Sequence, residues 1–297
     1  MYPTLIRLGP IGIHTFGLMM ACGFMAALLV LQREYRRKGI DPDLGSSVIF
    51  MAILGGIGGA KLYYVGLTGW DPRTILSGAG LAWYGGLIGG VAAIMLKLMF
   101  DKRVLRLDES GNPIGRRLGA AIDPVGPAAL IGQTCGRVGC FLSGDGDFGP
   151  PSDRAWALAF PNGTIPTVVD GEVIAVHPTM LYDVVMLAVA FAAAWMVRKR
   201  WDSRPGALFG LSLIALASVR FVSEFWRLTK VFSFTSTPMG WATRTLRDHV
   251  HGTEWEGTLM VDGVSEFQLW SLLTIVGGSV VIWRAFSKAR AMSRQDA

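Results

Sequence analysis

Apolar residues are gathered along this chain into seven long runs that are separated by more polar stretches. A helix needs about 20 consecutive, mostly apolar residues to cross the hydrocarbon core of a membrane, and each run has about that length. The pattern therefore predicts an all-α, polytopic integral membrane protein of about seven transmembrane helices. The runs, with ends placed to within several residues, are 11–31, 46–68, 78–100, 121–143, 178–197, 207–227 and 269–286.

The composition agrees with this pattern. Of the 297 residues, 51% are hydrophobic and only 17% are charged, and the mean hydropathy is +0.42. A soluble domain of this length needs more charge to keep its surface wetted. The first run is too long for the core of a signal peptide, and no small-residue cleavage site follows it, so we expect it to be retained as a span.

Positive charge is divided unevenly between the two sides that seven alternating spans would define. Most lysines and arginines fall on one side, in loops 32–45, 101–120 and 198–206 and in the C-terminal tail. Because lysine and arginine mark the cytoplasmic face of membrane proteins, we expect the N-terminus outside and the C-terminus in the cytoplasm. The net charge of +6 is thereby explained by orientation, and no nucleic-acid partner is expected.

We expect one transmembrane domain over 1–297, with two long segments on the periplasmic side. These are segment 144–177, which is rich in Gly, Pro and Asp, and segment 228–268, which carries two tryptophans and several charges. Loops of this length are usually either functional or disordered.

Neither a metal site nor a bound cofactor is expected. Cys22, Cys135 and Cys140 fall inside predicted helices and form no C-x-x-C pair. His249 and His251 lie near acidic residues, but within a charged stretch that we interpret as a flexible loop.

Glycines are frequent in the second and third runs, at 55–59 and 85–90. Small residues let helix backbones approach closely, so close helix packing is one interpretation. The other is that the backbone makes room for a lipid chain or head group.

Charged residues inside the runs are the main candidates for function, because each costs about 2.5–3.5 kcal/mol on insertion scales. Lys97 lies near the cytoplasmic end of its run and can snorkel to the surface. Four others fall in the outer half of the membrane on the assigned topology: Lys61, Arg137, Arg220 and Arg227.

The sixth run places Arg220, Glu224 and Arg227 at i, i+4 and i+7, on one face of a helix. Glu224 would then lie between two guanidiniums, and it could simply neutralise one of them. One positive charge is left over, and the ready anion in an outer-leaflet cavity is a phospholipid phosphate, which arginine binds bidentately.

The fourth run carries Arg137 among glycines and leads into an acidic turn with Asp145 and Asp147. These two carboxylates are either a solvated turn or groups that act as a base or position the reactants. His14 and Tyr84, near the ends of their runs, are either interface anchors or site residues. His177, before Pro178, either caps the fifth helix or acts in the site.

Six segments in collinear order resemble the prolipoprotein diacylglyceryl transferase family, and together they extend over most of the chain. They are 13–19, 59–64, 84–89, 136–149, 177–183 and 220–227. No segment is decisive alone, but the six in order are highly specific.

The resemblance implies a bacterial inner-membrane enzyme that performs the first step of lipoprotein maturation. Such an enzyme transfers the diacylglyceryl group of phosphatidylglycerol to the lipobox cysteine of a preprolipoprotein and releases glycerol 1-phosphate. The nucleophile is the substrate's thiol. By resemblance, Arg137 and Arg220 clamp the phosphate, Glu224 and Arg227 orient that clamp, and Tyr84 assists proton transfer. The catalytic set also includes Asp145, and the head-group site adds Lys61, Gly85, Gly86, His14, Ser143 and Gly149.

The chain departs from the family pattern at several of these positions. Tyr84 stands where the best-known members have His, Cys140 where many have Asn, and Asp145 where many have Glu, followed by a one-residue insertion. The identity of the base, and with it the acceptor, is therefore open. Two alternatives stay open as well: an enzyme of the same fold with a different acceptor, and a phospholipid-binding membrane protein without catalysis.

Overall fold

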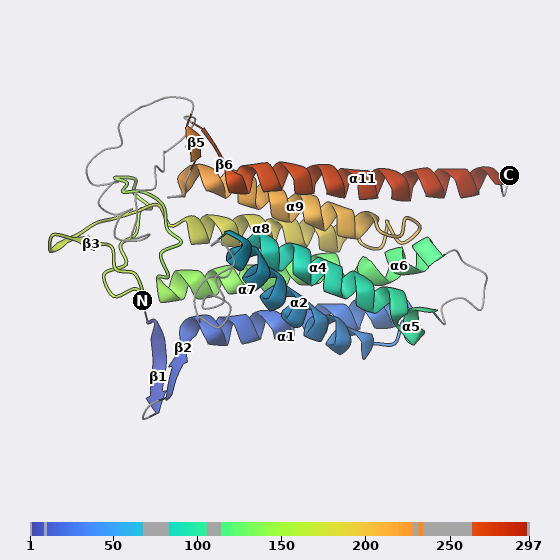
Figure 1. Ribbon diagram of the computed structural model, residues 1–297, viewed down its shortest axis with the longest axis horizontal. Helices are drawn as coiled ribbons and strands as arrows, with labels where there is room; N and C mark the ends of the chain where they lie inside the picture. Colours follow the sequence, from blue (N-terminus) through green and yellow to red (C-terminus); the bar gives the residue numbers. More distant parts are fainter. Residues whose placement is uncertain are drawn as a thin grey trace. The chain divides into compact units, whose positions relative to one another are not determined.

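The computed structural model describes residues 2–8, 11–67, 83–105, 114–227, 231–233 and 263–295, and long helices dominate it (Figure 1). Each predicted hydrophobic run overlaps one of these helices. They are α1 (Thr15–Arg37), α2 (Leu44–Leu67), α4 (Trp83–Phe100), α7 (Val125–Ser143), α8 (Thr179–Val197), α9 (Ala207–Ser223) and α11 (Glu266–Gln295).

Shorter elements connect the long helices. Two are the helices α5 (Lys102–Leu105) and α6 (Ile114–Ile122), and a 3-10 turn, η2 (Glu224–Trp226), follows α9. In the part of the chain that the structure describes, six short strands form three antiparallel pairs: β1 (Thr4–Leu8) with β2 (Ile11–His14), β3 (Val168–Val169) with β4 (Glu172–Val173), and β5 (Val231–Ser233) with β6 (Gly263–Ser265).

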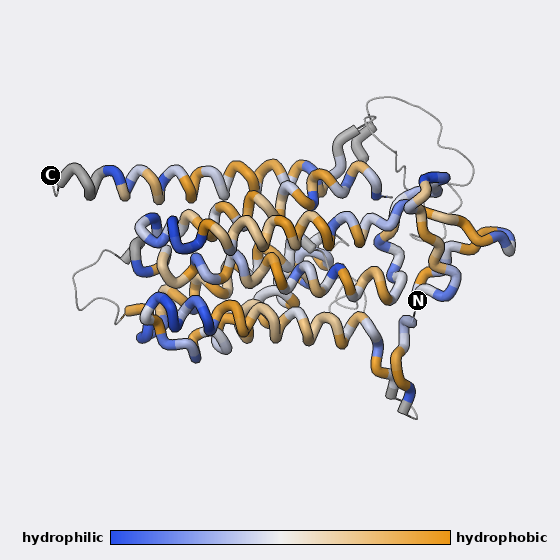
Figure 2. The backbone as a smooth tube through the Cα atoms, turned by 180° about the vertical axis from the view of Figure 1, so that it is seen from behind, coloured by the Kyte–Doolittle hydropathy of each residue, from blue (hydrophilic) through white to orange (hydrophobic). Residues whose placement is uncertain are grey.

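Within the described residues, five helices are long and apolar enough to cross a membrane: α1, α2, α8, α11, and α9 together with η2. Helix α4 is apolar but shorter, and α7 carries Gln133, Thr134 and Arg137 within its length. Figure 2 shows hydrophobic residues along these helices, whereas the connections after α1 and after α8 are hydrophilic. The protein is thus mostly helical, as expected for a polytopic membrane protein.

The chain forms two compact units. The first comprises Met1–Met25, Ala129–Ala193 and Ser212–Gly277, and the second comprises Ala26–Ala128, Ala194–Leu211 and Gly278–Ala297.

In the second unit, α2 and α4 pack through their glycines. A Cβ added to Gly59 would lie 2.8 Å from the Cα of Gly89, and one added to Gly89 would lie 2.7 Å from the Cα of Gly59. Gly58, one residue away on α2, would meet nothing within 4 Å. The glycines that face the partner helix therefore serve close backbone packing, as one of the two interpretations of the sequence predicted.

The first hydrophobic run is displaced from its predicted limits. Residues 11–14 are a strand that pairs with β1, and the helix begins only at Thr15 (Figure 1). At its other end, α1 continues past residue 31 to Arg37. Glu34 and Tyr35 are fully buried there, and the Tyr35 hydroxyl donates to the carbonyl oxygen of Ala121 at 3.0 Å. These tertiary contacts stabilise a polar extension of the helix that hydropathy does not predict.

Segment 144–177 is folded around a small apolar core. Phe148 and Phe160 are buried and stack with their ring centroids 5.4 Å apart, and Val176 is buried beside them. The Phe160 amide donates to Thr167 Oγ1 at 2.8 Å. The segment thus forms a defined scaffold next to the end of α7. Most of segment 228–268, including His249 and His251, lies outside the described residues.

Candidate active site

Among the described residues of the first unit, three arginines are buried. Arg137 belongs to α7, Arg220 lies one turn before the end of α9, and Arg227 follows η2. Their exposed fractions are 7%, 8% and 6%. Because an isolated buried charge is very costly, each guanidinium needs a nearby anion.

Asp147 is the anion shared by two of them. Its Oδ2 lies 2.6 Å from Arg227 Nη2 and also contacts Arg137 Nη1. The main-chain carbonyl oxygen of Asp147 accepts hydrogen bonds from Thr179 Oγ1 and, at 3.4 Å, from Arg227 Nη2. The Asp147 side chain is 41% exposed, whereas those of Arg137 and Arg227 are 9% and 5% exposed.

Two further carboxylates complete the group. Arg137 Nε lies 3.2 Å from Asp183 Oδ2, and Arg220 Nη2 lies 3.0 Å from Glu224 Oε2. The Arg220 guanidinium also lies over the Phe267 ring, 4.3 Å from its centroid. Among the described residues, Arg220 Nε and Asp183 Oδ1 are buried without a hydrogen-bond partner. We refer below to the arginine cluster as the collective name for two ion-paired groups of the first unit: Arg137, Asp147, Asp183 and Arg227, and the pair of Arg220 and Glu224.

The predicted stripe of Arg220, Glu224 and Arg227 on one helix is only half present. The i,i+4 pair of Arg220 and Glu224 forms, but α9 ends at Ser223, and Arg227 has an extended backbone with φ −106° and ψ 152°. Arg227 therefore leaves the helical face and pairs with Asp147. The leftover positive charge expected from the stripe is balanced by a carboxylate from another segment.

Gly149 brings this carboxylate into place. Its amide donates to the carbonyl oxygen of His177 at 2.8 Å, and an added Cβ would collide with the carbonyl oxygen of Trp226. Only glycine allows the loop after α7 to approach η2 this closely. Gly149 thus supports the cluster through the backbone.

Asp145 occupies a different environment from Asp147. The amide of Asp147 donates to Asp145 Oδ1 at 3.3 Å, and Asp145 forms no ion pair with any described residue. Burial and the neighbouring Asp147 charge raise the pKa of Asp145. Burial also opposes ionisation of Asp147, but Arg227 and Arg137 outweigh it and lower the pKa of Asp147 to about 2.

Cys140, Asp145 and Asp147 each offer a metal-ligand atom, and these atoms lie within 4.8 Å of one another. Asp147 is already bound by two guanidiniums, which would compete with any cation. The donor set therefore does not favour a metal ion.

Two other predicted site residues of the first unit contact structural groups. Ser143 is buried; its hydroxyl donates to the carbonyl oxygen of Cys140 at 3.1 Å, and its own carbonyl oxygen accepts from Thr164. His14 is exposed at the end of β2, where its Nδ1 lies 3.3 Å from Thr4 Oγ1.

The remaining predicted site residues belong to the second unit. Tyr84 and Gly85 are buried at the start of α4, and Lys61 Nζ lies over the Tyr64 ring, 5.9 Å from its centroid. A Cβ added to Gly85 would meet the Cα of Ala60 at 3.1 Å, so Gly85 faces the backbone of α2. Gly86 has more room, with its nearest neighbour 3.4 Å away.

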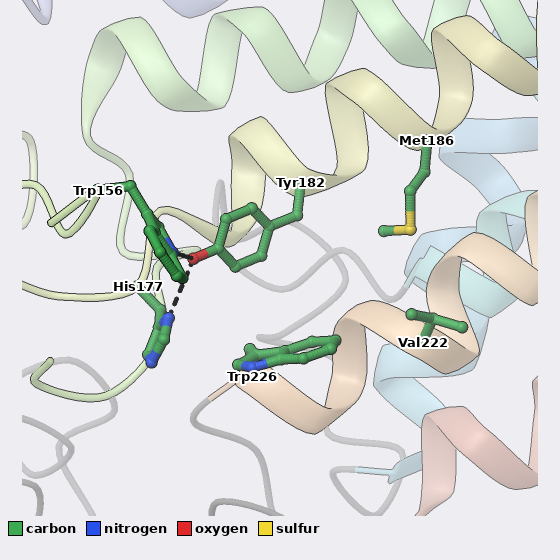
Figure 3. A pocket seen from close by; sticks show the side chains of 6 residues that line it. All are labelled: Trp156, His177, Tyr182, Met186, Val222 and Trp226. Atoms are coloured by element: carbon green, nitrogen blue, oxygen red, sulfur yellow. Dashed lines mark hydrogen bonds between the residues drawn. The ribbon is translucent and has the colours of Figure 1, made fainter. Parts of the chain in front are cut away.

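A pocket of about 370 Å³ lies beside α8 and α9 in the first unit (Figure 3). At its polar end Trp156 Nε1 donates to the Tyr182 hydroxyl at 2.9 Å, and this hydroxyl lies 3.0 Å from His177 Nδ1. Burial, followed by the charge of Arg154, lowers the pKa of His177. The lining is otherwise apolar: Met186, Val222 and Trp226. His177 is thus a hydrogen-bonding member of this pocket.

The sequence analysis left Asp183 out of the predicted site. Asp183 lies inside the fifth hydrophobic run, where a carboxylate is as costly as an arginine, so applying the same test to acidic residues would have found it. For Asp147 the sequence left two interpretations open, a solvated turn or a base or positioning group, and only Asp145 was included in the predicted catalytic set.

Comparison with known proteins identifies relatives along most of the chain. The sequence model of the family described as prolipoprotein diacylglyceryl transferase matches residues 3–284.

Individual relatives carry the name phosphatidylglycerol–prolipoprotein diacylglyceryl transferase. That of Synechococcus elongatus is 31% identical over 206 residues, which are 66% of this chain and 65% of the relative. That of Vibrio atlanticus is 30% identical over 242 residues, 76% of this chain and 78% of the relative. That of Methylococcus capsulatus is 29% identical over 255 residues, 81% of this chain and 87% of the relative.

Proposed function

The chain belongs to the prolipoprotein diacylglyceryl transferase family, and from this premise we propose that it transfers the diacylglyceryl group of phosphatidylglycerol to the lipobox cysteine of a preprolipoprotein. The observation that carries the proposal is the arginine cluster, which supplies three buried guanidiniums from α7, from α9 and from the residue after η2. Guanidiniums are the side chains best suited to bind a phosphate through paired hydrogen bonds.

The reaction breaks one bond and forms another. The substrate thiol gives up its proton, its sulfur attacks the glyceryl carbon that carries the phosphate, and the carbon–oxygen bond breaks. Glycerol 1-phosphate leaves with the electron pair of that bond. Charge develops on the departing phosphate, and Arg137 and Arg220 stabilise it there, which is where preorganised cations lower the barrier most.

The neighbours of these arginines hold them in position. Glu224 pairs with Arg220 at 3.0 Å, and Asp183 pairs with Arg137 at 3.2 Å. The Nε atom of Arg220 is buried without a hydrogen-bond partner among the described residues, so this guanidinium keeps one donor that no described group uses. Arg227 binds both the carboxylate and the carbonyl oxygen of Asp147 and thereby holds the loop after α7 beside Arg137.

The proton acceptor is proposed from its place in the sequence. Tyr84 stands before Gly85 and Gly86, where the family resemblance puts a functional His, and Asp145 stands where it puts a Glu. Lys61, His14, Ser143 and Gly149 complete the proposed head-group site. A Tyr84→Phe enzyme keeps the ring and removes one hydroxyl, and loss of a proton-transfer partner costs about 10²–10⁴-fold in rate. Full activity of that variant in a purified assay would direct the search to Asp145, Glu224 or His14.

The proposal includes a topology. Seven spans cross the bacterial inner membrane as one transmembrane domain over 1–297, with segments 144–177 and 228–268 in the periplasm and the C-terminus in the cytoplasm. The distribution of lysine and arginine supports this orientation. Cysteines introduced at Asp153 and Ser110 test it with a membrane-impermeant thiol reagent. Asp153→Cys should be labelled in intact cells, and labelling of Ser110→Cys under the same conditions would exclude the seven-span arrangement.

The decisive test of function is a purified reaction. The protein is incubated with phosphatidylglycerol in membranes and a lipobox peptide, and the peptide is analysed by mass spectrometry. We expect a thioether-linked diacylglyceryl product, and none from a peptide with Ser in place of the lipobox Cys. Release of glycerol 1-phosphate without modification of the peptide would favour a different acceptor. Binding of the lipid without either product would favour the non-catalytic alternative.

A further inference from the structure

Asp147 is placed where a ligand anion would be expected. A single carboxylate oxygen, Oδ2, is contacted by Arg137 Nη1 and by Arg227 Nη2, the latter at 2.6 Å. Two guanidiniums that converge on one oxygen form the arrangement that binds a phosphate oxygen. The side chain of this chain's own loop thus fills an anion position.

The carboxylate and the backbone of Asp147 are held very differently. Its carbonyl oxygen accepts hydrogen bonds from Thr179 and Arg227, and Gly149 joins the same loop to His177. The carboxylate is far more exposed than the arginines that it contacts, with 41% of the Asp147 side chain exposed. It can therefore rotate away from the guanidiniums while the loop keeps its place.

The arginines cannot move in this way. The side chains of Arg137 and Arg227 are 9% and 5% exposed, and Arg137 is also paired with the buried Asp183. An anion that approaches from the open side therefore meets a fixed pair of guanidiniums and one displaceable carboxylate.

We propose that Asp147 is a built-in counter-ion that the phosphate of the substrate displaces when it binds and that returns when the phosphorylated product leaves. This inference rests on the proposed function and deepens it in one respect: the phosphate held by Arg137 also contacts Arg227, in the place that the Asp147 carboxylate occupies between turnovers. In the empty site the carboxylate neutralises two guanidiniums that would otherwise repel each other. During turnover it competes with the product, whose phosphate would otherwise stay bound to them.

Removal of this competitor should tighten anion binding. The apparent affinity of a ligand is its intrinsic affinity multiplied by the fraction of protein whose site is open. If Asp147 fills the site about nine-tenths of the time, the ligand binds about 10-fold more weakly than it would to an open site. In Asp147→Asn the dissociation constant of glycerol 1-phosphate should fall by about 10-fold. That of phosphatidylglycerol in vesicles should fall less, because its phosphodiester carries one negative charge and the product's monoester carries close to two.

A matched control exists in the second unit. Asp202 is 39% exposed and pairs with two cations, Arg37 and Lys38. Asp202→Asn should leave both dissociation constants unchanged. The variant Asp147→Glu keeps the charge and should bind glycerol 1-phosphate within a few-fold of the wild type.

The experiment measures binding of glycerol 1-phosphate and of phosphatidylglycerol vesicles, with the melting temperature recorded with and without glycerol 1-phosphate. Asp147→Asn should melt lower than the wild type alone and should be stabilised more than the wild type by the ligand. Weaker binding with no rescue of the melting temperature would show that Asp147 only builds the site. Unchanged binding with a loss of turnover would assign it to proton transfer. Either result would contradict the proposal that Asp147 is a displaceable counter-ion.

Failure of the proposed function is detected separately. If the purified protein modifies no peptide but Asp147→Asn still binds glycerol 1-phosphate more tightly, the counter-ion proposal is supported and the proposed transfer reaction is wrong. If transfer is observed and the dissociation constants do not change, the counter-ion is wrong and the enzyme assignment is unaffected.

Discussion

The arginine cluster of the first unit has a counterpart in the second, near the end of α1. There Glu34 is fully buried, and each of its carboxylate oxygens has an arginine: Arg37 Nη2 lies 2.7 Å from Oε2, and Arg198 Nε lies 3.0 Å from Oε1. Lys38 joins Asp123 at 3.5 Å and Asp202 at 3.6 Å. We refer to these residues as the Glu34 cluster: Glu34, Arg37, Lys38, Asp123, Arg198 and Asp202.

The two clusters hold the same number of cations and carboxylates among the described residues, but they differ in how completely their polar atoms are bonded. In the Glu34 cluster no buried side-chain nitrogen or oxygen of the described residues lacks a partner. Asp123 Oδ1, for example, also accepts a hydrogen bond from the amide of Phe209 at 3.1 Å. In the arginine cluster Arg220 Nε and Asp183 Oδ1 are left over.

This difference favours a structural role for the Glu34 cluster and supports the proposed binding role of the arginine cluster. A buried charge network in which every atom is bonded locks the elements that carry it, whereas an unused donor such as Arg220 Nε leaves capacity for an anion. Charge balance alone would not have told the two apart.

The largest effect should come from Arg137→Ala compared with Arg198→Ala. Without Arg137, transfer should fall by about 10³-fold or more, because a group that stabilises charge in the transition state is lost. Arg198→Ala should keep the turnover of folded enzyme within about 3-fold while it lowers stability, since it removes one of the two cations paired with the buried Glu34, and breaking a buried ion pair costs up to about 3–5 kcal/mol. Turnover per folded molecule in the peptide assay measures both. Comparable losses of turnover in the two variants would erase the distinction between the clusters.

Glu34→Gln should affect stability and nothing else. It breaks two buried ion pairs at once, and we expect the melting temperature to fall by the equivalent of about 3 kcal/mol. Glu172→Gln, on an exposed residue of β4, is the control and should stay within about 0.5 kcal/mol. The dissociation constant of phosphatidylglycerol should match the wild type in both. A weaker lipid affinity in Glu34→Gln would mean that the Glu34 cluster also serves binding.

Arg220→Lys tests whether planar recognition matters in the arginine cluster. The variant keeps the charge but loses the planar guanidinium that binds two oxygens at once. Turnover should therefore fall by about 10–100-fold, which corresponds to the loss of one or two charge-assisted hydrogen bonds. The same change at Arg200, an exposed residue after α8, should leave turnover unaltered. Near-normal turnover of Arg220→Lys would exclude bidentate phosphate binding at this position.

The smallest effect should appear in the pH dependence of stability. The pKa of Asp147 is lowered to about 2, chiefly because Arg227 and Arg137 outweigh the cost of burial, against an ordinary value of about 3.9. The stabilisation is complete above about pH 4 and is lost as the pH falls through 2. We therefore compare the drop in melting temperature between about pH 4 and about pH 2 in the two proteins. In thermal unfolding, this drop should be a few degrees smaller for Asp147→Asn than for the wild type. Glycerol 1-phosphate should remove this difference by displacing the carboxylate.

Much of the fold follows from the sequence. Each hydrophobic run overlaps a helix, and the fifth run, 178–197, differs from α8 by a single residue. The ends are less predictable where polar residues are buried. Helix α1 extends to Arg37 because Glu34 and Tyr35 find partners, and residues 11–14 join a hairpin because β1 is there to pair with them.

The sequence predicted the arginines of the candidate site but not their partners. The cost of a charge within an apolar run identifies Arg137, Arg220 and Arg227, and the structure brings all three together with carboxylates. Their partners were not predictable, because residue spacing relates only side chains on the same helix.

The sequence by itself determined that this is a helical membrane protein with a family-specific set of arginines, because hydropathy and the order of motifs are properties of the linear chain. Only the tertiary structure decided which carboxylate meets which guanidinium. Arg227 binds Asp147 from another segment because α9 ends at Ser223, and Arg137 meets Asp183 because α7 and α8 carry them to the same place. Ion pairs form between neighbours in space, and loop geometry such as the close approach at Gly149 sets those neighbours.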